Sequence, residues 1–243
     1  MAMAPAPKPE VSVILATYNE KDHILPLIGE LTQKISRTLE IIVVDDHSED
    51  GTAELVAGLA DPRVILIQRK VRGLASAFHR GIIESTGDII CWMDADMCMP
   101  VDTLIQMIER LKECDLAIGS RYAPGGVDDR PPLRVWSSRF INGVARLVLG
   151  GQVRDYDSGF VALHRKVFDS VTLIPFGYGE YFIEMVYDAT RRGLKICEVG
   201  YYFRDRAEGV SKSIPNVFRF FITGSHYLFR ILTLRFRFLR GGN

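Results

Sequence analysis

The sequence lacks several features that would assign it to a class directly. Its 30 basic and 30 acidic residues give a formal net charge of zero over 243 residues. No overall positive field favours nucleic acid, so we expect no nucleic-acid partner. No apolar run approaches the ~20 residues that span a bilayer. In the C-terminal segment the longest run without arginine, Phe220–Phe229, is too short.

Cysteine is scarce, and its spacing indicates neither a zinc site nor disulfides. The four residues form no C-x-x-C pair and no His cluster accompanies them; they are Cys91, Cys98, Cys114 and Cys197. Reduced thiols of this kind are typical of a cytoplasmic protein. The opening residues 1–10, MAMAPAPKPE, lack the apolar core of a signal peptide, and we expect them to be a disordered lead.

What the sequence does contain is an alternation of short apolar runs with helical patterns. Strands are expected over 11–16, 40–44, 63–67, 88–93 and 116–119, and helices over 23–35, 73–84 and 100–113. This alternation predicts an α/β fold with a mostly parallel sheet flanked by helices. Beyond residue 121 we expect helices over 133–149 and 180–192, short strands within 156–163 and 194–203, and no second domain.

Polar residues gather where the expected strands end. They are Tyr18, Asn19, Glu20, Asp45, Asp46, Asp94, Asp96 and Arg121. Ligands of parallel sheets bind beyond the carboxyl ends of the strands, so this clustering predicts one active site.

Asp94-Ala95-Asp96 follows the apolar strand IICWM. Residues two apart on an extended chain point the same way, so both carboxylates can converge on a hard cation such as Mg²⁺ or Mn²⁺. The other interpretation is a pair of caps before the helix at Pro100. Position at a strand end favours the metal.

The remaining strand ends suit a nucleotide and phosphates. Of Asp45 and Asp46, one carboxylate could bind a ribose or base and the other could cap the turn SEDGT. Tyr18 could stack on a base and Glu20 could accept a hydrogen bond from it. The basic residues, with Ser138 one helical turn after Arg134, suggest two phosphate sites; they are Arg121, Arg134, Arg206 and Lys212.

Seven motifs give the chain a family resemblance. They are ATYNE (16–20), VVDDHSEDGT (43–52), GLASA (73–77), MDADM (93–97), GSRY (119–122), DYDSGF (155–160) and R-x-x-G-x-S-K (206–212). In order and spacing they resemble dolichol-phosphate mannosyltransferases, which are inverting polyprenyl-phosphate glycosyltransferases of family 2. The resemblance covers residues 11–213 and implies a GT-A fold, a Rossmann-like sheet.

The resemblance implies a role for each matching residue. Donor contacts would come from Ala16, Tyr18, Glu20, Val44, Asp46, Asp94, Ala95, Asp96, Arg206 and Lys212. The lipid phosphate would bind Arg121, Arg134 and Ser138, and Asp96, Arg121 and Asp155 would be catalytic. Ala16 stands where the family usually has proline. Cys98 stands where it usually has a metal-binding glutamine, and a thiolate suits softer metals than Mg²⁺.

The implied reaction is transfer of mannose from GDP-mannose to a polyprenyl, dolichyl-type phosphate in a single displacement. The alternative within this class is an undecaprenyl-phosphate glycosyltransferase that uses UDP-glucose or another nucleotide sugar. A nucleotidyltransferase would need a Gly-rich basic loop that ATYNE does not provide. A catalytically inactive nucleotide-sugar-binding scaffold remains open because of Cys98.

A lipid acceptor requires contact with a membrane. In residues 214–243, helical spacing places Arg219, His226, Arg230 and Arg237 on one face and Phe221, Leu228 and Leu239 on the opposite face. A basic amphipathic helix suits an anionic membrane surface, so we expect a peripherally membrane-associated cytoplasmic protein. The other interpretation is a helix packed on the domain or on a membrane-embedded partner subunit.

Overall fold

The computed structural model describes residues 8–204 and the helix 217–240, with side chains in that helix described for 224–237. A seven-stranded sheet contains β1 (Val11–Thr17), β2 (Leu39–Asp45), β3 (Val64–Gln68), β4 (Ile89–Asp94), β5 (Leu116–Ser120), β7 (Val161–His164) and β8 (Ile196–Gly200). A separate two-stranded ribbon pairs β6 (Val127–Asp129) with β9 (Tyr202–Arg204). Residues 1–7 of the predicted lead 1–10, and the predicted boundary at residue 213, lie outside the described residues.

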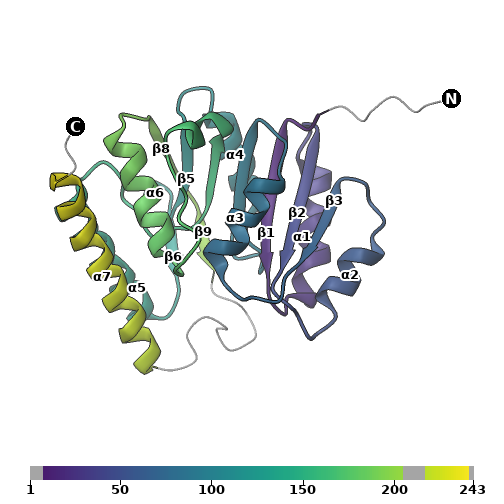
Figure 1. Cartoon of the computed structure of the whole chain (residues 1–243), viewed down its shortest axis with the longest axis horizontal. Coiled ribbons are helices and arrows are strands. Elements are labelled where there is room, and N and C mark those ends of the chain that lie inside the picture. Colours follow the sequence, from purple (N-terminus) through teal and green to yellow (C-terminus); the bar gives the residue numbers. More distant parts are fainter. Residues whose placement is uncertain (1–7, 205–216, 241–243) are drawn as a thin grey trace.

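The large sheet has the order β3-β2-β1-β4-β7-β5-β8. Every pairing in it is parallel except those of β7, which runs antiparallel to both β4 and β5. The expected mostly parallel α/β sheet (Figure 1) is therefore confirmed, with one reversed strand, β7, between β4 and β5.

Helices cover both faces of the sheet. They are α1 (Lys21–Lys34), α2 (Thr52–Gly58), α3 (Leu74–Glu84), α4 (Val101–Arg110), α5 (Pro132–Leu149), α6 (Glu180–Arg191) and α7 (Val217–Arg240), with a 3₁₀ helix η1 (Arg165–Asp169). Strand alternation divides the core. Ile14 of β1 packs in the core that includes α3, α5 and α6, whereas Val13 and Leu15 pack in the core that includes α1 and α4.

The strand expected over 194–203 is divided in two at Tyr201. The Tyr201 N–H donates to the Ser120 carbonyl, and the Tyr201 carbonyl accepts from the Val127 N–H. The chain thus passes from pairing with β5 to pairing with β6. Gly200 is required at this crossing because an added Cβ would lie 2.2 Å from the Pro124 carbonyl oxygen.

The C-terminal helix α7 packs on the domain beside α5 and α6 (Figure 1). Tyr227, Ile231 and Leu234 are buried in the core that contains α6. Two of the arginines predicted for the basic face, Arg230 and Arg237, form ion pairs with Glu184 of α6. That face therefore turns partly toward the domain, because a buried glutamate on α6 needs cationic partners. No helix in the described ranges is both long and apolar enough to cross a bilayer.

Candidate active site

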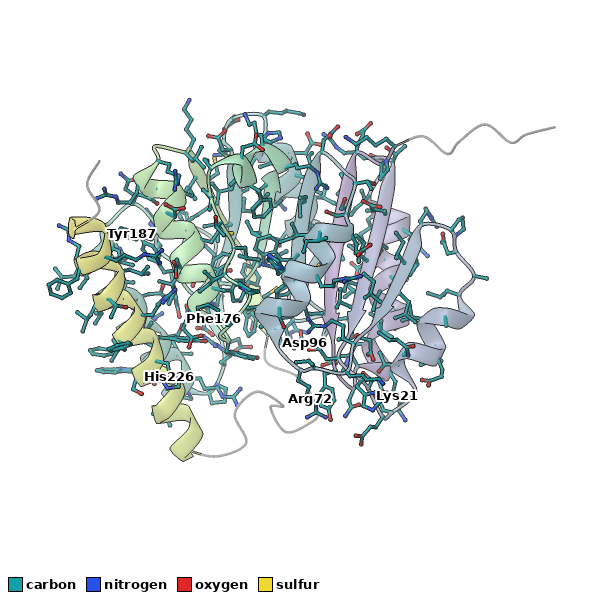
Figure 2. The ribbon with its side chains drawn as sticks, viewed as in Figure 1. Lys21, Arg72, Asp96, Phe176, Tyr187 and His226 are labelled. Atoms are coloured by element: carbon teal, nitrogen blue, oxygen red, sulfur yellow. The ribbon has the colours of Figure 1, made fainter. Side chains whose placement is uncertain are left out.

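Three residues predicted to contact a donor lie side by side at one edge of the sheet. The strand register pairs Ala16 of β1 with Val44 of β2 and with Asp94 of β4. Figure 2 shows Asp96, Arg72 and Lys21 along this same edge. The carboxyl ends of three adjacent parallel strands therefore meet here, and ligands of such sheets bind beyond these ends.

The two aspartates at the end of β2 have different hydrogen-bond partners. Asp45 is 1% exposed and accepts from the N–H of Ser48 at 2.9 Å and from the hydroxyl of Thr17 at 3.0 Å. The expected cap of the SEDGT turn is confirmed, and Asp45 provides it. Asp46 instead accepts from Arg69 Nε at 2.7 Å and from the N–H of Gly73 at 2.8 Å. Asp46 therefore ties the end of β2 to the start of α3.

Tyr18 and Glu20, predicted for the base, follow β1 at the same edge. The Arg72 guanidinium carbon lies 3.5 Å from the centre of the Tyr18 ring, a cation–π stack. Glu20 is 5% exposed and its carboxylate lies 3.1 Å from His23 Nδ1. The Tyr18 ring thus already supports a planar group, which is how an aromatic ring would hold a base.

The Asp94-Ala95-Asp96 turn presents two carboxylates beyond β4. Asp96 Oδ1 accepts from the Cys98 N–H at 3.1 Å, and Met97 between them adopts a left-handed φ of +62°. Within the described ranges, no three His, Cys, Asp or Glu side chains gather into a metal-binding group. Cys98 stays a prediction as a metal ligand. Its backbone serves to hold Asp96.

Two carboxylates nevertheless fit a hard divalent cation whose other ligands come from a substrate. Mg²⁺ commonly binds one or two protein carboxylates together with substrate phosphates and waters. Asp94 and Asp96 supply that part of the shell, and Asp96 is oriented by the Cys98 N–H. The residues present thus suit a metal that arrives with a diphosphate.

Next to this turn lies a buried polar group that we call the Arg121 cluster: Arg121, Ser138, Asn142, Asp155 and Asp157. Arg121 donates from Nε to Asp155 at 2.8 Å and from Nη2 to Asp155 at 2.6 Å and Asp157 at 2.5 Å. Ser138 donates to Asp157 at 3.1 Å, and so does Asn142 at 2.7 Å. Predicted acceptor residues Arg121 and Ser138 therefore share one carboxylate, and Arg134 lies one turn before Ser138 on α5.

The charges of the Arg121 cluster perturb one another strongly. Burial would lower the pKa of Arg121, but Asp155 and Asp157 raise it well above its usual value. Burial raises the pKa of the Asp155 carboxyl to about 6, against the attraction of Arg121. The pKa of Asp157 stays below its usual value because Arg121 and Arg130 outweigh its burial. With both carboxylates ionised, Arg121, Asp155 and Asp157 together carry a net charge of −1.

Reversal of β7 explains how Asp155 and Asp157 reach this edge. Val161 at the start of β7 pairs with Trp92 near the end of β4, so the residues before β7 lie where β4 ends. The motif DYDSGF immediately precedes β7. Because β7 is antiparallel, the loop that precedes it lies at the edge where the parallel strands have their C-terminal ends.

Sequence reasoning missed Asn142, Tyr201 and the bridging role of Asp157. Tyr201 is 3% exposed, and its hydroxyl has no hydrogen-bond partner within the described ranges. Burial and the nearby Asp155 and Asp94 raise its pKa well above the usual value, against the effect of Arg121. No sequence feature indicated that Tyr201 lies between the Asp94-Ala95-Asp96 turn and the Arg121 cluster, because its position depends on the break between β8 and β9. Arg206 and Lys212 lie outside the described residues.

This fold and this edge together define a GT-A-type glycosyltransferase. The chain belongs to glycosyl transferase family 2, whose model matches residues 12–172. Within that family it belongs with the polyprenyl-phosphate mannosyltransferases. It is 37% identical to a dolichol-phosphate mannosyltransferase of Pyrococcus furiosus, covering 84% of this chain and 59% of that protein. It is 34% identical to a polyprenol monophosphomannose synthase of Mycolicibacterium smegmatis, covering 85% and 82%.

Solved structures share the fold. Glucosyl-3-phosphoglycerate synthase from Mycobacterium tuberculosis, in complex with Mn²⁺, UDP and glucosyl-3-phosphoglycerate, has a TM-score of 0.69 at 18% identity. The match covers 93% of this chain and 80% of that one. This chain spans about three fifths of the length of the Pyrococcus relative.

Proposed function

We propose that this protein transfers mannose, with inversion, from GDP-mannose to a polyprenyl phosphate of the dolichyl type, and that the transfer depends on a divalent metal. One observation carries the proposal: the carboxylate pair Asp94 and Asp96 lies at the same sheet edge as the arginine of a buried phosphate-suited cluster. The names of three relatives at 31–37% identity support the sugar and the acceptor: a dolichol-phosphate mannosyltransferase, a polyprenol monophosphomannose synthase and an undecaprenyl-phosphate mannosyltransferase.

The donor would lie across the ends of β1, β2 and β4. Its base would stack on Tyr18, which requires Arg72 to leave the ring or to sandwich the base against it. Ala16, Val44, Glu20 and Asp46 would line the nucleoside, and Arg206 and Lys212 would contact the phosphates. Because Asp46 is held by Arg69 and Gly73, it is preoriented rather than free to rotate.

Asp94 and Asp96, with the backbone at Ala95, would hold the metal against the diphosphate. A bound Mg²⁺ or Mn²⁺ would neutralise negative charge that develops on the leaving nucleoside diphosphate. The contribution of the chain itself is to fix the two carboxylates in one turn before substrate arrives. The M. tuberculosis structures with Mn²⁺ or Mg²⁺ and UDP support this kind of metal dependence in the fold.

The acceptor phosphate would approach Arg121, Arg134 and Ser138. Nη1 of Arg121 makes no hydrogen bond within the described ranges, so it can donate to a phosphate while Asp155 and Asp157 keep the other nitrogens. A phosphate monoester is mostly dianionic at pH 7 because its second pKa is near 6. One phosphate oxygen forms a bond to the anomeric carbon as the bond from that carbon to the diphosphate breaks.

This scheme gives Asp155 a positioning role. Its carboxylate accepts from the Arg121 side chain and, at 2.9 Å, from the Arg121 N–H. An already ionised nucleophile needs no base, and a carboxylate committed to Arg121 is poorly placed to be one. Asp155 would instead fix the guanidinium plane that faces the phosphate.

Peripheral association with a membrane would bring the lipid to the site. Large apolar side chains are exposed on the two helices beside the Arg121 cluster; they are Leu133, Trp136, Phe140 and Leu147 on α5 and Phe229, Leu232 and Phe236 on α7. Exposed apolar side chains on adjacent amphipathic helices are typical of membrane-surface binding. The apolar residues, more than the inward-turned Arg230 and Arg237, support this association.

A donor panel tests the proposal. The chain is incubated with a short-chain polyprenyl phosphate and either GDP-mannose or UDP-glucose, with Mn²⁺, Mg²⁺ or EDTA. We expect mannosyl lipid from GDP-mannose with metal and none with EDTA. Product from UDP-glucose without product from GDP-mannose would replace the mannosyl assignment by the glucosyl one. If no nucleotide sugar gives product, the proposed transfer is wrong and a nucleotide-sugar-binding protein is the remaining interpretation.

A further inference from the structure

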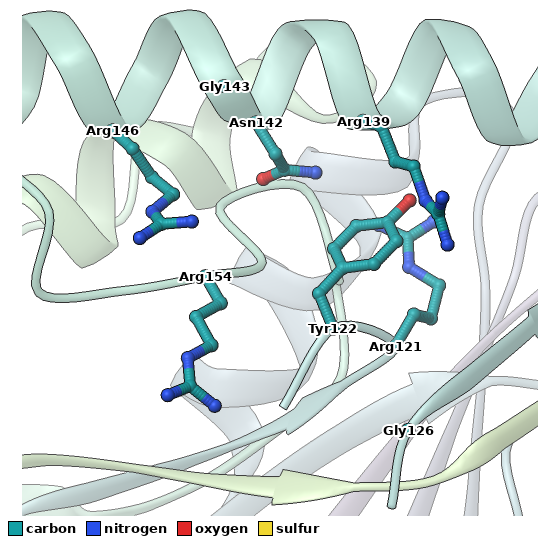
Figure 3. A pocket seen from close by; sticks show the side chains of 8 residues that line it. All are labelled: Arg121, Tyr122, Gly126, Arg139, Asn142, Gly143, Arg146 and Arg154. Carbon is teal, nitrogen blue, oxygen red and sulfur yellow. The ribbon is translucent and has the colours of Figure 1, made fainter. Parts of the chain in front are cut away.

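A second basic site lies on the outer side of the Arg121 cluster, under helix α5. A pocket of about 430 Å³ is lined by Arg121, Tyr122, Gly126, Arg139, Asn142, Gly143, Arg146 and Arg154. We call it the α5 pocket. Its volume is in the range of small-ligand sites, 300–1,000 Å³. Figure 3 shows Arg146 and Arg154 at one end and Arg139 with Tyr122 and Arg121 at the other.

The arginines of the α5 pocket differ from other arginines of the chain in their partners. Arg121 donates from Nε and Nη2 to Asp155 and Asp157, and Arg63, Arg69 and Arg80 each pair with a carboxylate. Within the described ranges, Arg139, Arg146 and Arg154 form no ion pair, and Arg139 only faces the Tyr122 ring at 6.0 Å. Three guanidinium groups around one pocket without carboxylates create a site for an anion.

Besides Asp155 and Asp157, which bind Arg121 and Asn142, a further carboxylate approaches this region, and it is engaged with the backbone. Glu198 accepts from the N–H of Arg154 at 3.0 Å and from the N–H of Asp155 at 3.1 Å. These bonds hold the loop that carries Arg154 against β8. Glu198 thereby positions Arg154 and leaves its guanidinium group to other partners.

The pocket adjoins the apolar stripe of α5. Arg139, Gly143 and Arg146 follow one line along the helix, at spacings of four and three residues. Trp136, Phe140 and Leu147, which are 76%, 54% and 87% exposed, follow the next line. Gly143 adds no side chain between the two arginines, so the pocket stays open there. If the apolar line enters a membrane, the arginine line lies at head-group depth.

We propose that the α5 pocket binds the phosphate of an anionic phospholipid head group, and so acts as a lipid site separate from the acceptor phosphate site. The proposal rests on the membrane association proposed above. Arg146 and Arg154 make the principal contacts, and Arg139 closes the opposite end. Arg121 and Asn142 lie where the α5 pocket borders the Arg121 cluster, whereas Arg146 and Arg154 line the pocket and make no printed contact with that cluster.

The test uses vesicle binding by the full chain. Trp136 is the exposed tryptophan of the two, since Trp92 is fully buried, so a blue shift of its emission reports contact with lipid. Vesicles of phosphatidylcholine alone are compared with vesicles that also contain phosphatidylglycerol. We expect wild-type chain to prefer the anionic vesicles, and the double variant Arg146→Gln/Arg154→Gln to lose about thirtyfold in affinity for them.

A matched control separates a pocket from diffuse charge. Arg63→Gln/Arg80→Gln removes the same charge from β3 and α3, away from α5 and α7 (Figure 1). It should change vesicle affinity by less than about threefold. Equal loss in both double variants would overturn the pocket. Equal wild-type binding to both vesicle types would overturn it too, while leaving membrane association intact; binding to neither would remove the membrane association itself.

A second arm distinguishes a head group from a free anion. Inorganic phosphate is titrated into vesicle-free chain, and the side-chain N–H signals of Arg146 and Arg154 are followed by NMR. Binding weaker than about 10 mM is expected for phosphate without its lipid. Submillimolar binding would overturn the lipid assignment in favour of a soluble phosphate ligand. Mannosyl transfer to a short-chain acceptor in detergent should be unchanged in Arg146→Gln/Arg154→Gln, which separates this site from the proposed reaction.

Discussion

On the donor half of the sheet, formed by β1, β2 and β4, each candidate side chain follows the strand that carries it. Ala16, Val44 and Asp94 share one level of the strand register, and their neighbours in sequence make up the site. On the acceptor half, formed by β5, β7, β8 and α5, the Arg121 cluster joins side chains from three separate segments.

This difference predicts how the fold of each half responds to amino-acid substitution. The donor carboxylates Asp94 and Asp96 are partly exposed and held by local backbone bonds, so they should be replaceable without loss of the fold. In the acceptor half, Arg121, Asp155 and Asp157 are buried ions that hold one another. In that half, function and stability depend on the same contacts.

The largest expected effect is on stability, in the acceptor half. Arg121→Met leaves Asp155 and Asp157 buried without their guanidinium, and breaking a buried ion pair in this way costs about 3–5 kcal/mol. Chemical denaturation measures it. The control is Arg63→Met, because Arg63 makes the same two-pronged contact with Asp61 at the surface. Its loss should be below about 1 kcal/mol, and similar losses in both variants would contradict the comparison.

Asp96→Asn should show the opposite pattern in the donor half. Weaker metal binding should reduce mannosyl transfer by roughly 10²–10³-fold, while the free energy of unfolding changes by less than about 0.5 kcal/mol. Turnover and thermal unfolding are measured together. Asp102→Asn on α4 is the control, since Asp102 is an exposed acid that pairs with Lys34. If Asp96→Asn keeps its turnover, the proposed metal dependence is wrong.

The C-terminal helix α7 allows a buried and an exposed side chain to be compared within one element. Ile231→Ala removes a fully buried side chain between α7 and the domain, and should lower the free energy of unfolding by about 2–4 kcal/mol. Leu232→Ala, at a neighbouring side chain that is 47% exposed, should leave it within about 0.5 kcal/mol. Leu232→Ala should instead weaken binding to vesicles. Equal destabilisation by the two changes would mean that α7 is not docked as described.

The smallest expected effect on turnover concerns Tyr201, between the two halves. Tyr201→Phe removes a buried hydroxyl without a described partner, so stability should be unchanged or rise by up to about 1 kcal/mol. Turnover should fall about tenfold if that hydroxyl binds a reacting group. Tyr156→Phe is the control: its hydroxyl donates to the Gly150 carbonyl at 3.0 Å, so it should lose stability and keep activity. Full turnover in Tyr201→Phe would give Tyr201 a packing role.

Much of the donor half could be predicted from the sequence because its information is local. A β-branched apolar run followed by Asp-x-Asp specifies a buried strand and the two acids after it. The same reasoning predicted that one of Asp45 and Asp46 caps the following turn, and Asp45 does so because its partner Ser48 is three residues away. It could not decide whether Cys98 offers its thiol or its backbone N–H, because that depends on the turn at Met97.

The acceptor half was less predictable because its contacts join distant residues. Asp157 bridges Arg121, 36 residues away, and Asn142, 15 residues away. Periodicity placed α5 correctly but not the direction of β7, and thus not why DYDSGF faces Asp94. The tail followed helical spacing as expected, yet spacing could not indicate that Glu184 on α6 would attract Arg230 and Arg237.

The reversed strand β7 also has a consequence for how the protein folds. It is the seam of the sheet: β4, contributed by residues 89–94, and β5, contributed by residues 116–120, are joined only through it. The β4–β7 pairing joins residues about 70 positions apart, as in Trp92 with Val161, and the β1–β4 pairing joins residues about 80 apart, as in Val11 with Ile89, so both depend on long-range contacts. The edge is complete only when β7 has paired with both β4 and β5, and amide hydrogen exchange along Val161–His164 reports the joining of the two halves.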